Sequence, residues 1–189
     1  MRHAEPATTD AGEGGAEDPS LGERGRAQAE RVADWLTRQP IDRVVSSPAR
    51  RARETAAATA AKTGLEVEID DRLRDAEEAG TRYVPIEVAR ADDPEAYRAR
   101  VEAYRSSPRL ASIAPRVNAS LDEWAERHRG GRIAVFCHGS VINAFAIRVL
   151  GLQDAGFLEA GFASGHRFLV SSSGVRSVQS LNETAYLID

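Results

Sequence analysis

The sequence is poor in residues that mark several large classes of protein. A single cysteine, Cys137, occurs among 189 residues, so no disulfide can form within the chain. No apolar stretch is long enough to cross a bilayer, and the N-terminal region lacks the apolar core of a signal peptide. These absences favour a cytoplasmic protein without a membrane partner.

Lysine is almost absent as well. Lys62 is the only one, so 24 of the 25 basic residues are arginine, and the formal net charge is −4. This balance argues against nucleic-acid binding, because such proteins usually present a strongly basic face. The excess of arginine fits a biased overall composition, but the planar guanidinium also grips phosphate oxygens better than an ammonium group does.

The length and composition suit one soluble domain over residues 1–189. Apolar residues make up 42% of the chain and charged residues 29%, which is the balance of an ordinary globular protein. Helical periodicity and alanine-rich runs, bounded by proline and glycine, predict the helices. They cover residues 29–36, 48–61, 93–104, 117–125 and 141–149, and Ser47 is the expected N-cap of the second.

Short runs typical of strands lie between these helices, at residues 41–46, 65–69 and 133–137. The last run is apolar throughout, as in a strand buried on both faces. A hairpin is predicted over residues 168–181. The alternation of strands and helices predicts an α/β fold of three layers, α/β/α, with a mostly parallel central sheet.

Residues 75–115 are polar and irregular apart from the helix that starts at Asp93-Pro94. One interpretation is a helical insertion that forms a lid over the carboxyl edge of the sheet. The other is a solvated helical excursion with no role in a site. The sequence leaves both open.

Three candidates for chemistry follow predicted strands. Arg51 lies in the first turn of a helix after a strand, His138 ends the apolar strand, and Asp75 comes shortly after residues 65–69. Ligands of parallel α/β sheets bind at the carboxyl ends of the strands. We therefore expect these three side chains to meet at one edge of the sheet.

Arg2 and His3 would complete this set, but only Met1 precedes them. A residue at the carboxyl end of a strand needs that strand. Four or five buried apolar side chains would contribute about 1.5–3 kcal/mol each, which rivals the total stability of about 5–15 kcal/mol of a typical domain. We therefore expect the natural chain to start upstream, with Met1 as the last residue of a first strand.

Five segments resemble the histidine phosphatase superfamily, in its small bacterial, phosphoglycerate-mutase-like branch. They are Arg-His-Ala-Glu at residues 2–5, Leu-Gly-Glu-Arg-Gly-Arg-Ala-Gln-Ala at 21–29, Ser-Ser-Pro-Ala-Arg-Arg-Ala-Arg-Glu-Thr-Ala at 46–56, Phe-Cys-His-Gly at 136–139 and Ser-Leu-Asn-Glu-Thr-Ala-Tyr-Leu at 180–187. Each segment alone is a weak signal. All five occur in the family's order and cover nearly the whole chain.

The resemblance implies a role for each matching residue. His3 would be the nucleophile that becomes phosphorylated, and the phosphoryl oxygens would be bound by Arg2, Arg51 and His138. The family often has a glutamate as proton donor where this chain has Asp75, so Glu77 and Glu78 stay open as alternatives. Thr9 stands where many members have an asparagine near the phosphate, and Ala4 replaces the usual glycine.

The chemistry agrees with these residue types. Phosphoryl transfer depends on positioning and charge stabilisation, which arginine supplies. A neutral His3 can attack, because neighbouring cations disfavour its protonated form and a bond to a backbone carbonyl can fix its tautomer. The residues call for neither a metal nor another cofactor.

We therefore expect a metal-independent phosphatase that acts on a small phosphomonoester through a phosphohistidine. A phosphoglycerate-type mutase with the same nucleophile is one alternative. A catalytically inactive module that binds a phosphoryl ligand is the other.

Overall fold

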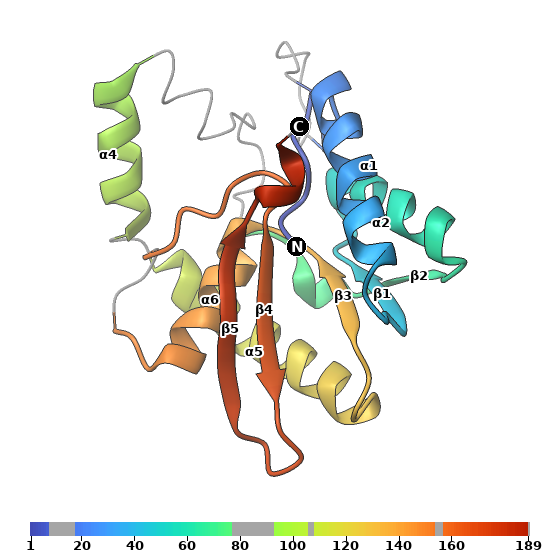
Figure 1. Ribbon diagram of the computed structural model, residues 1–189. Helices are drawn as coiled ribbons and strands as arrows, with labels where there is room; N and C mark the ends of the chain where they lie inside the picture. The colour runs from blue at the N-terminus through green and yellow to red at the C-terminus, as the bar shows by residue number, and fades with distance from the viewer. Residues whose placement is uncertain (8–17, 77–92, 106–107, 154–156, 189) are drawn as a thin grey trace.

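The computed structural model describes residues 1–7, 18–76, 93–105, 108–153 and 157–188 (Figure 1). Its central sheet has three parallel strands in the order β2-β1-β3, formed by Val67–Ile69, Arg43–Ser46 and Ile133–Phe136. Val45 of β1 lies opposite Glu68 on one side and Val135 on the other. The predicted parallel sheet is confirmed.

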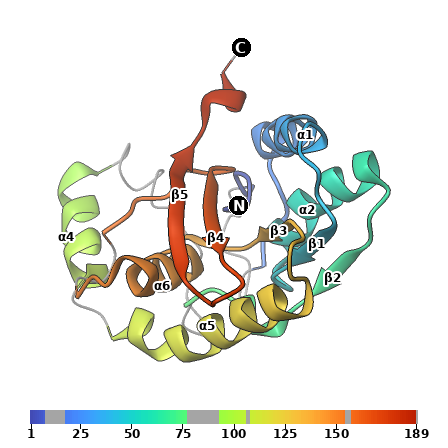
Figure 2. The ribbon, with the colours of Figure 1, turned by 60° about the horizontal axis from the view of Figure 1, so that its bottom comes forward.

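Four helices cover the two faces of this sheet (Figure 2). On one side α1 (Glu23–Thr37) packs against α2 (Arg50–Thr63), and on the other α5 (Arg109–Arg127) packs against α6 (Gly139–Leu150). Side chains of β1 alternate between the two layers. Val44 belongs to the apolar cluster of α1 and α2 and Val45 to that of α5 and α6, so the fold has the three layers expected.

The C-terminal hairpin stands apart from the three-stranded sheet. Strands β4 (Gly165–Val170) and β5 (Arg176–Glu183) pair antiparallel with each other, and a short 3₁₀ helix, η2 (Ala185–Leu187), follows. Tyr186 in η2 stacks on Trp35 of α1, with 4.3 Å between the ring centroids. This stacking connects the segment that follows the hairpin to α1.

Two helix boundaries differ from the sequence-based expectation. Helix α2 has Ala49 rather than Ser47 as its N-cap, because Ser47 still donates its backbone N–H to Phe136 of β3. Helix α5 begins at Arg109 and runs through Pro115, which we expected to lie in an irregular region. Leu110 and Ile113 of this first part are buried in the core, so tertiary packing outweighs the backbone hydrogen bond that proline removes.

The helix predicted at Asp93-Pro94 is present as α4 (Pro94–Arg105). Figures 1 and 2 show it on the opposite side of the molecule from α1 and α2. The Tyr97 hydroxyl donates a hydrogen bond to Glu159, with 2.7 Å between the oxygens. The role of this insertion as a lid stays a prediction.

Helix α1 touches the N-terminal segment backbone to backbone. A Cβ atom added at Gly25 would lie 1.9 Å from the carbonyl oxygen of Glu5. The same carbonyl accepts a hydrogen bond from the Gly22 amide, and the Glu5 amide donates to the Gln28 side chain at 2.9 Å. Helix α1 therefore holds the chain directly after His3.

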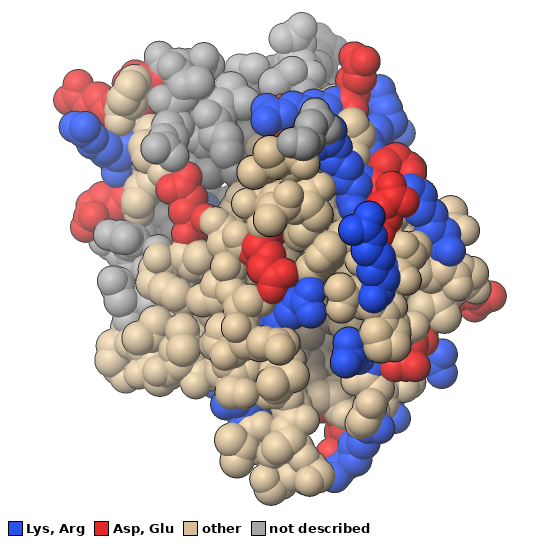
Figure 3. All heavy atoms as spheres, in the orientation of Figure 1, with Lys and Arg blue, Asp and Glu red and all other residues tan. Residues whose placement is uncertain are grey.

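The surface shows no concentration of one charge on the face seen in Figure 3, where acidic and basic side chains are intermixed around α1. Within the described ranges, no helix combines the length and hydropathy needed to span a bilayer.

Candidate active site

The segments that carry the expected site residues meet at the carboxyl edge of the sheet. His138 follows β3 after Cys137 and directly precedes α6, and Arg51 lies in the first turn of α2 after β1. Arg2 pairs with Cys137 as a parallel bridge, and the His3 amide donates to the Cys137 carbonyl at 2.9 Å. The structure thus brings together five residues singled out in the sequence: Arg2, His3, Arg51, Asp75 and His138.

His3 is buried and held in one tautomer. Its Nδ1 lies 2.8 Å from the Ala4 carbonyl oxygen, so Nδ1 carries the proton and donates it there. The other nitrogen, Nε2, accepts a hydrogen bond of 3.3 Å from Nε of Arg51. Nε2 therefore presents its lone pair toward the cationic side of the pocket, as an attacking nucleophile requires.

Arg51 is the centre of the pocket, although its side chain is only 1% exposed. One terminal nitrogen lies 3.4 Å from a carboxylate oxygen of Asp75 and 3.4 Å from Nδ1 of His138. The other lies 3.7 Å from a carboxylate oxygen of Asp18. This guanidinium has the geometry to contact His3 and a phosphoryl group at once, as the bidentate fork of arginine allows.

Arg2 supplies a second buried cation. Its guanidinium donates to the Ala160 carbonyl and lies 4.1 Å from the centroid of the Phe162 ring. The ring of Phe162 also packs 5.7 Å from that of His3. A carbonyl and an aromatic face thus hold Arg2 beside His3.

Burial and neighbouring charge keep both histidines neutral. Burial, followed by the nearby His138, Arg2 and Arg51, lowers the pKa of His3 well below its usual value. Burial is also the main reason that the pKa of His138 falls to about 4, against the opposing attraction of Asp75. Both rings are uncharged at neutral pH, so His3 keeps a lone pair on Nε2 and His138 can donate a hydrogen bond.

The carboxyl group of Asp75 lies between His138 and helix α6. One oxygen is 3.4 Å from Nδ1 of His138, and the other accepts hydrogen bonds from the Ser140 hydroxyl and, at 2.8 Å, from the Ala76 amide. Burial alone would raise the pKa of Asp75. The positive charges and hydrogen bonds around the carboxylate outweigh this effect and lower its pKa. Asp75 is therefore ionised in the empty pocket.

The segment that carries Asp75 is anchored from α5. Arg116 donates to the carbonyl oxygens of Arg72, Arg74 and Asp75. The short 3₁₀ helix η1 (Asp71–Leu73), just before Asp75, is fixed by the buried carboxylate of Asp70. That carboxylate accepts hydrogen bonds from Ser120 at 2.7 Å and Trp124 at 2.9 Å. Helix α5 thus sets the position of Asp75.

Four side chains around the pocket were not expected there from the sequence. Ser47 lies 2.8 Å from Nε2 of His138, and Thr55 accepts from the Ala4 amide while donating to the Arg51 carbonyl. Ser140 contacts Asp75, and Asp18 accepts from the Arg50 amide at 2.8 Å. Ser47 and Thr55 belong to the segment over residues 46–56, so their place in that motif was the available signal.

Three residues named in the sequence interpretation, Thr9, Glu77 and Glu78, lie outside the described residues. Asp75 is the one candidate acid with a described position. Within the described ranges, no group of three or more His, Cys, Asp or Glu side chains could hold a metal ion.

The chain belongs to the histidine phosphatase superfamily (branch 1), whose sequence pattern matches residues 1–182. This membership confirms the resemblance seen in the five motifs. Among the relatives is phosphoserine phosphatase 1 of Hydrogenobacter thermophilus, which is 30% identical, with 99% of this chain and 92% of the relative covered.

Glucosyl-3-phosphoglycerate phosphatase of Mycobacterium tuberculosis is 34% identical over 76% of this chain and 70% of its own length. The native structure of the mycobacterial glucosyl-3-phosphoglycerate phosphatase superposes with a TM-score of 0.76 at 27% identity, covering 97% of both chains. The α/β architecture is therefore shared with solved members of the family.

Proposed function

We propose that this protein is a phosphatase that hydrolyses a small phosphomonoester through a phosphohistidine formed on His3. The observation that carries the proposal is the fixed tautomer of His3: Nδ1 is held by the Ala4 carbonyl, while Nε2 faces the guanidinium of Arg51. The family membership and the phosphatases among the relatives agree with this chemistry.

In the first step Nε2 of His3 attacks the phosphorus atom, and the bond between phosphorus and the ester oxygen breaks. Arg2 and Arg51 neutralise charge on the phosphoryl oxygens, and His138 donates a hydrogen bond to one of them. The leaving oxygen takes a proton from Asp75. In the second step Asp75 accepts a proton from water, which attacks the phosphohistidine and releases phosphate and neutral His3.

Asp75 must be protonated for the first step, although it is ionised in the empty pocket. The dianionic substrate provides the reason for the change. A negative charge brought close to a carboxylate disfavours its ionised form and raises its pKa. Substrate binding therefore favours the protonated form of Asp75, which holds the proton that the leaving group needs.

The relatives narrow the class of substrate. Phosphoserine and glucosyl-3-phosphoglycerate, after which two relatives are named, are both phosphorylated carboxylic acids. We propose a substrate of this class, acted on in the cytoplasm as the sequence suggests.

The test measures phosphate release from phosphoserine, 3-phosphoglycerate and glucosyl-3-phosphoglycerate by the wild type and by His3→Ala. We expect His3→Ala to lose more than about 10³-fold in rate, since it removes the nucleophile. His128→Ala is the matched control, because His128 stacks on Trp124 at the far end of α5 and should keep full activity. Acid-labile phosphate on the wild type, absent from His3→Ala, would identify the phosphohistidine.

Two outcomes would reverse the proposal. Faster formation of 2-phosphoglycerate than of phosphate from 3-phosphoglycerate, with bisphosphoglycerate present, would establish a mutase. Equal background rates for the wild type and His3→Ala, with both proteins folded, would establish a binding module.

A further inference from the structure

Two carboxylates contact the guanidinium of Arg51, each through a different terminal nitrogen. Nη2 of Arg51 lies 3.4 Å from a carboxylate oxygen of Asp75, and Nη1 lies 3.7 Å from Oδ1 of Asp18. The same Asp18 oxygen accepts a hydrogen bond of 2.8 Å from the Arg50 amide. The edge of the pocket therefore carries a second negative charge, which the catalytic steps proposed above do not use.

The residues that follow Asp18 hold it at the start of α2. Pro19 and Leu21 are buried, and the Leu21 amide donates a hydrogen bond of 2.7 Å to Glu54 of α2. The Asp18 carboxylate thus reaches the first turn of α2 from an anchored segment. Ala49, the N-cap of α2, has no side-chain oxygen that could take its place.

The two members of this ion pair differ in exposure. The side chain of Arg51 is 1% exposed and that of Asp18 is 53% exposed. Asp18 stays hydrated and avoids the cost of burying a charge, whereas a buried guanidinium depends on nearby anions for compensation. Loss of the Asp18 charge would therefore leave Arg51 with more positive charge available to another anion.

A phosphoryl group that binds to Arg51 meets the Asp18 carboxylate as a competitor, because both are anions. One unit charge at about 4 Å in a hydrated setting is enough to change an affinity about fivefold. In the proposed reaction Asp75 gains and loses a proton, whereas Asp18 takes no part in proton transfer. Asp18 is therefore suited to act as a constant counter-charge beside Arg51.

We propose that Asp18 is a positioning residue that acts through Arg51: it holds one arm of the guanidinium fork and, by competing for its charge, limits how tightly the pocket retains phosphate. The inference rests on the proposed phosphatase reaction. Uniformly strong binding of substrate, transition state and product does not raise kcat, and it slows product release. An anion fixed beside Arg51 weakens the complexes with substrate and phosphate, while the held arm preserves the alignment that the transition state needs.

The test measures the dissociation constant of inorganic phosphate by calorimetry for the wild type, Asp18→Asn and Asp18→Ala. Asparagine keeps an oxygen for the Arg50 amide but removes the charge, and alanine removes both. We expect both variants to bind phosphate about fivefold more tightly than the wild type, since both lose the competing charge. Asp18→Ala alone should lower Tm by a few degrees, because it alone loses the cap of α2.

Glu54→Gln is the matched control. It also removes one carboxylate from the start of α2, but that carboxylate contacts the Leu21 amide and the Arg50 side chain rather than Arg51. Its phosphate affinity should stay within about 1.5-fold of the wild type, because salt screens exposed charges that do not touch the ligand's partner.

Turnover of the best ester provides a second measurement. In Asp18→Asn we expect kcat and KM both to fall at least about threefold, because the substrate is held more tightly but is less well aligned. A purely structural role would instead raise KM or leave it unchanged.

Phosphate binding by Asp18→Asn that is equal to or weaker than that of the wild type would overturn the proposal. Equal tightening in Glu54→Gln would also overturn it, by assigning the effect to net charge. Weaker binding in Asp18→Ala, with Asp18→Asn unchanged, would reduce Asp18 to a cap of α2. The calorimetry needs no turnover, so a wild type that binds phosphate but hydrolyses no ester would contradict the proposed function and still leave the comparison of variants to decide the role of Asp18.

Discussion

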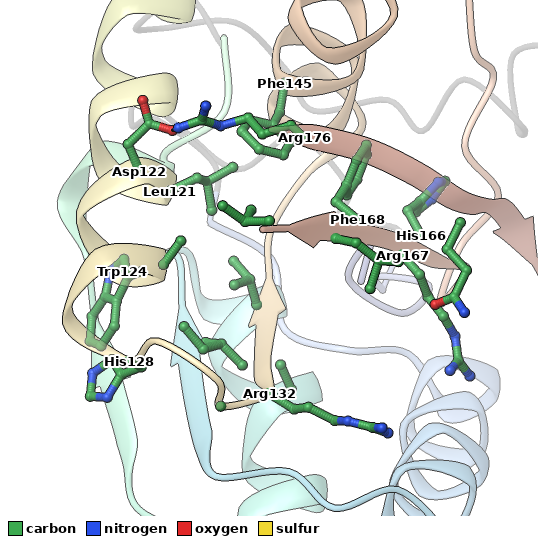
Figure 4. Close-up of a pocket in the computed structure, with 18 of the residues that line it drawn as sticks. Leu121, Asp122, Trp124, His128, Arg132, Phe145, His166, Arg167, Phe168 and Arg176 are labelled. Carbon is green, nitrogen blue, oxygen red and sulfur yellow. The ribbon is translucent and has the colours of Figure 1, made fainter. Parts of the chain in front are cut away.

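The pocket around His3 and the groove between β3 and β4 (Figure 4), which is lined by Met1, Val135 and Phe168 among others, differ in how well their side chains are covered. In the pocket the described ionisable groups have partners from several elements, with Arg51 reaching His3, Asp75 and His138 within 3.4 Å. In the groove the apolar side chains of Val135 and Leu169 remain partly or largely exposed. The polar side chains at the strand ends thus contact one another closely, whereas the apolar side chains that face the groove are incompletely covered.

After His3→Ala, we expect the largest effect from a change at Arg51, which tests how strictly the pocket depends on the geometry of the guanidinium. Arg51→Lys keeps the charge but loses the planar fork, so we expect phosphate release to fall about 10²-fold or more. Arg50→Lys, which alters the exposed neighbour paired with Glu54, is the control and should leave the rate unchanged. A rate for Arg51→Lys close to that of the wild type would mean that charge alone suffices.

Two valine substitutions compare the packing of the core with the packing of the groove. Val45→Ala removes buried methyl groups, and we expect it to lower the free energy of unfolding by about 2 kcal/mol. Val135→Ala, in the adjacent strand, should cost less than about 1 kcal/mol, because its side chain is already partly exposed. Urea unfolding measures both values, and equal costs would show that the groove side of β3 is as well packed as the core.

The smallest effect concerns the pH dependence set by Asp75. Because the pKa of Asp75 is lowered in the free enzyme, kcat/KM for the dianionic substrate should fall as the pH rises through that pKa and the acid form is lost. Ser140→Ala removes a hydrogen bond that favours the ionised carboxylate. It should raise this pKa and move the alkaline fall in kcat/KM to higher pH by the same amount.

Asp75→Asn provides the control for this profile, since it should lose the alkaline fall together with most of the rate. An unchanged profile in Ser140→Ala, with the protein folded, would assign the proton to another group.

Much of the pocket could be predicted from the sequence because its residues occupy fixed places relative to strands. Arg51 and His138 both come shortly after the end of a parallel strand, so the sheet places them at the same edge. No comparable pattern in the sequence indicated a role for Ser140. Its role depends on the placement of Asp75 against α6, which Arg116 of α5 brings about from forty-one residues further along the chain.

Boundaries were less predictable where tertiary contacts decide them. The Ser47 hydroxyl faces His138 and its amide continues the strand pairing, although Ser-Pro reads locally as a helix start. The burial of Leu110 extends α5 backward through Pro115, which local rules treat as a boundary. In both cases distant partners outweigh the local preference of the residue.

The contact between Gly25 and Glu5 has a consequence for how this protein can vary. Because the carbonyl of Glu5 occupies the space of any Cβ at position 25, even one methyl group there would push helix and loop apart. The loop that moves begins at Ala4, whose carbonyl fixes the proton of the nucleophile. Glycine at position 25, which has only a hydrogen atom in place of a side chain, thus helps to set the orientation of the His3 imidazole. A larger residue at this position would disturb that orientation.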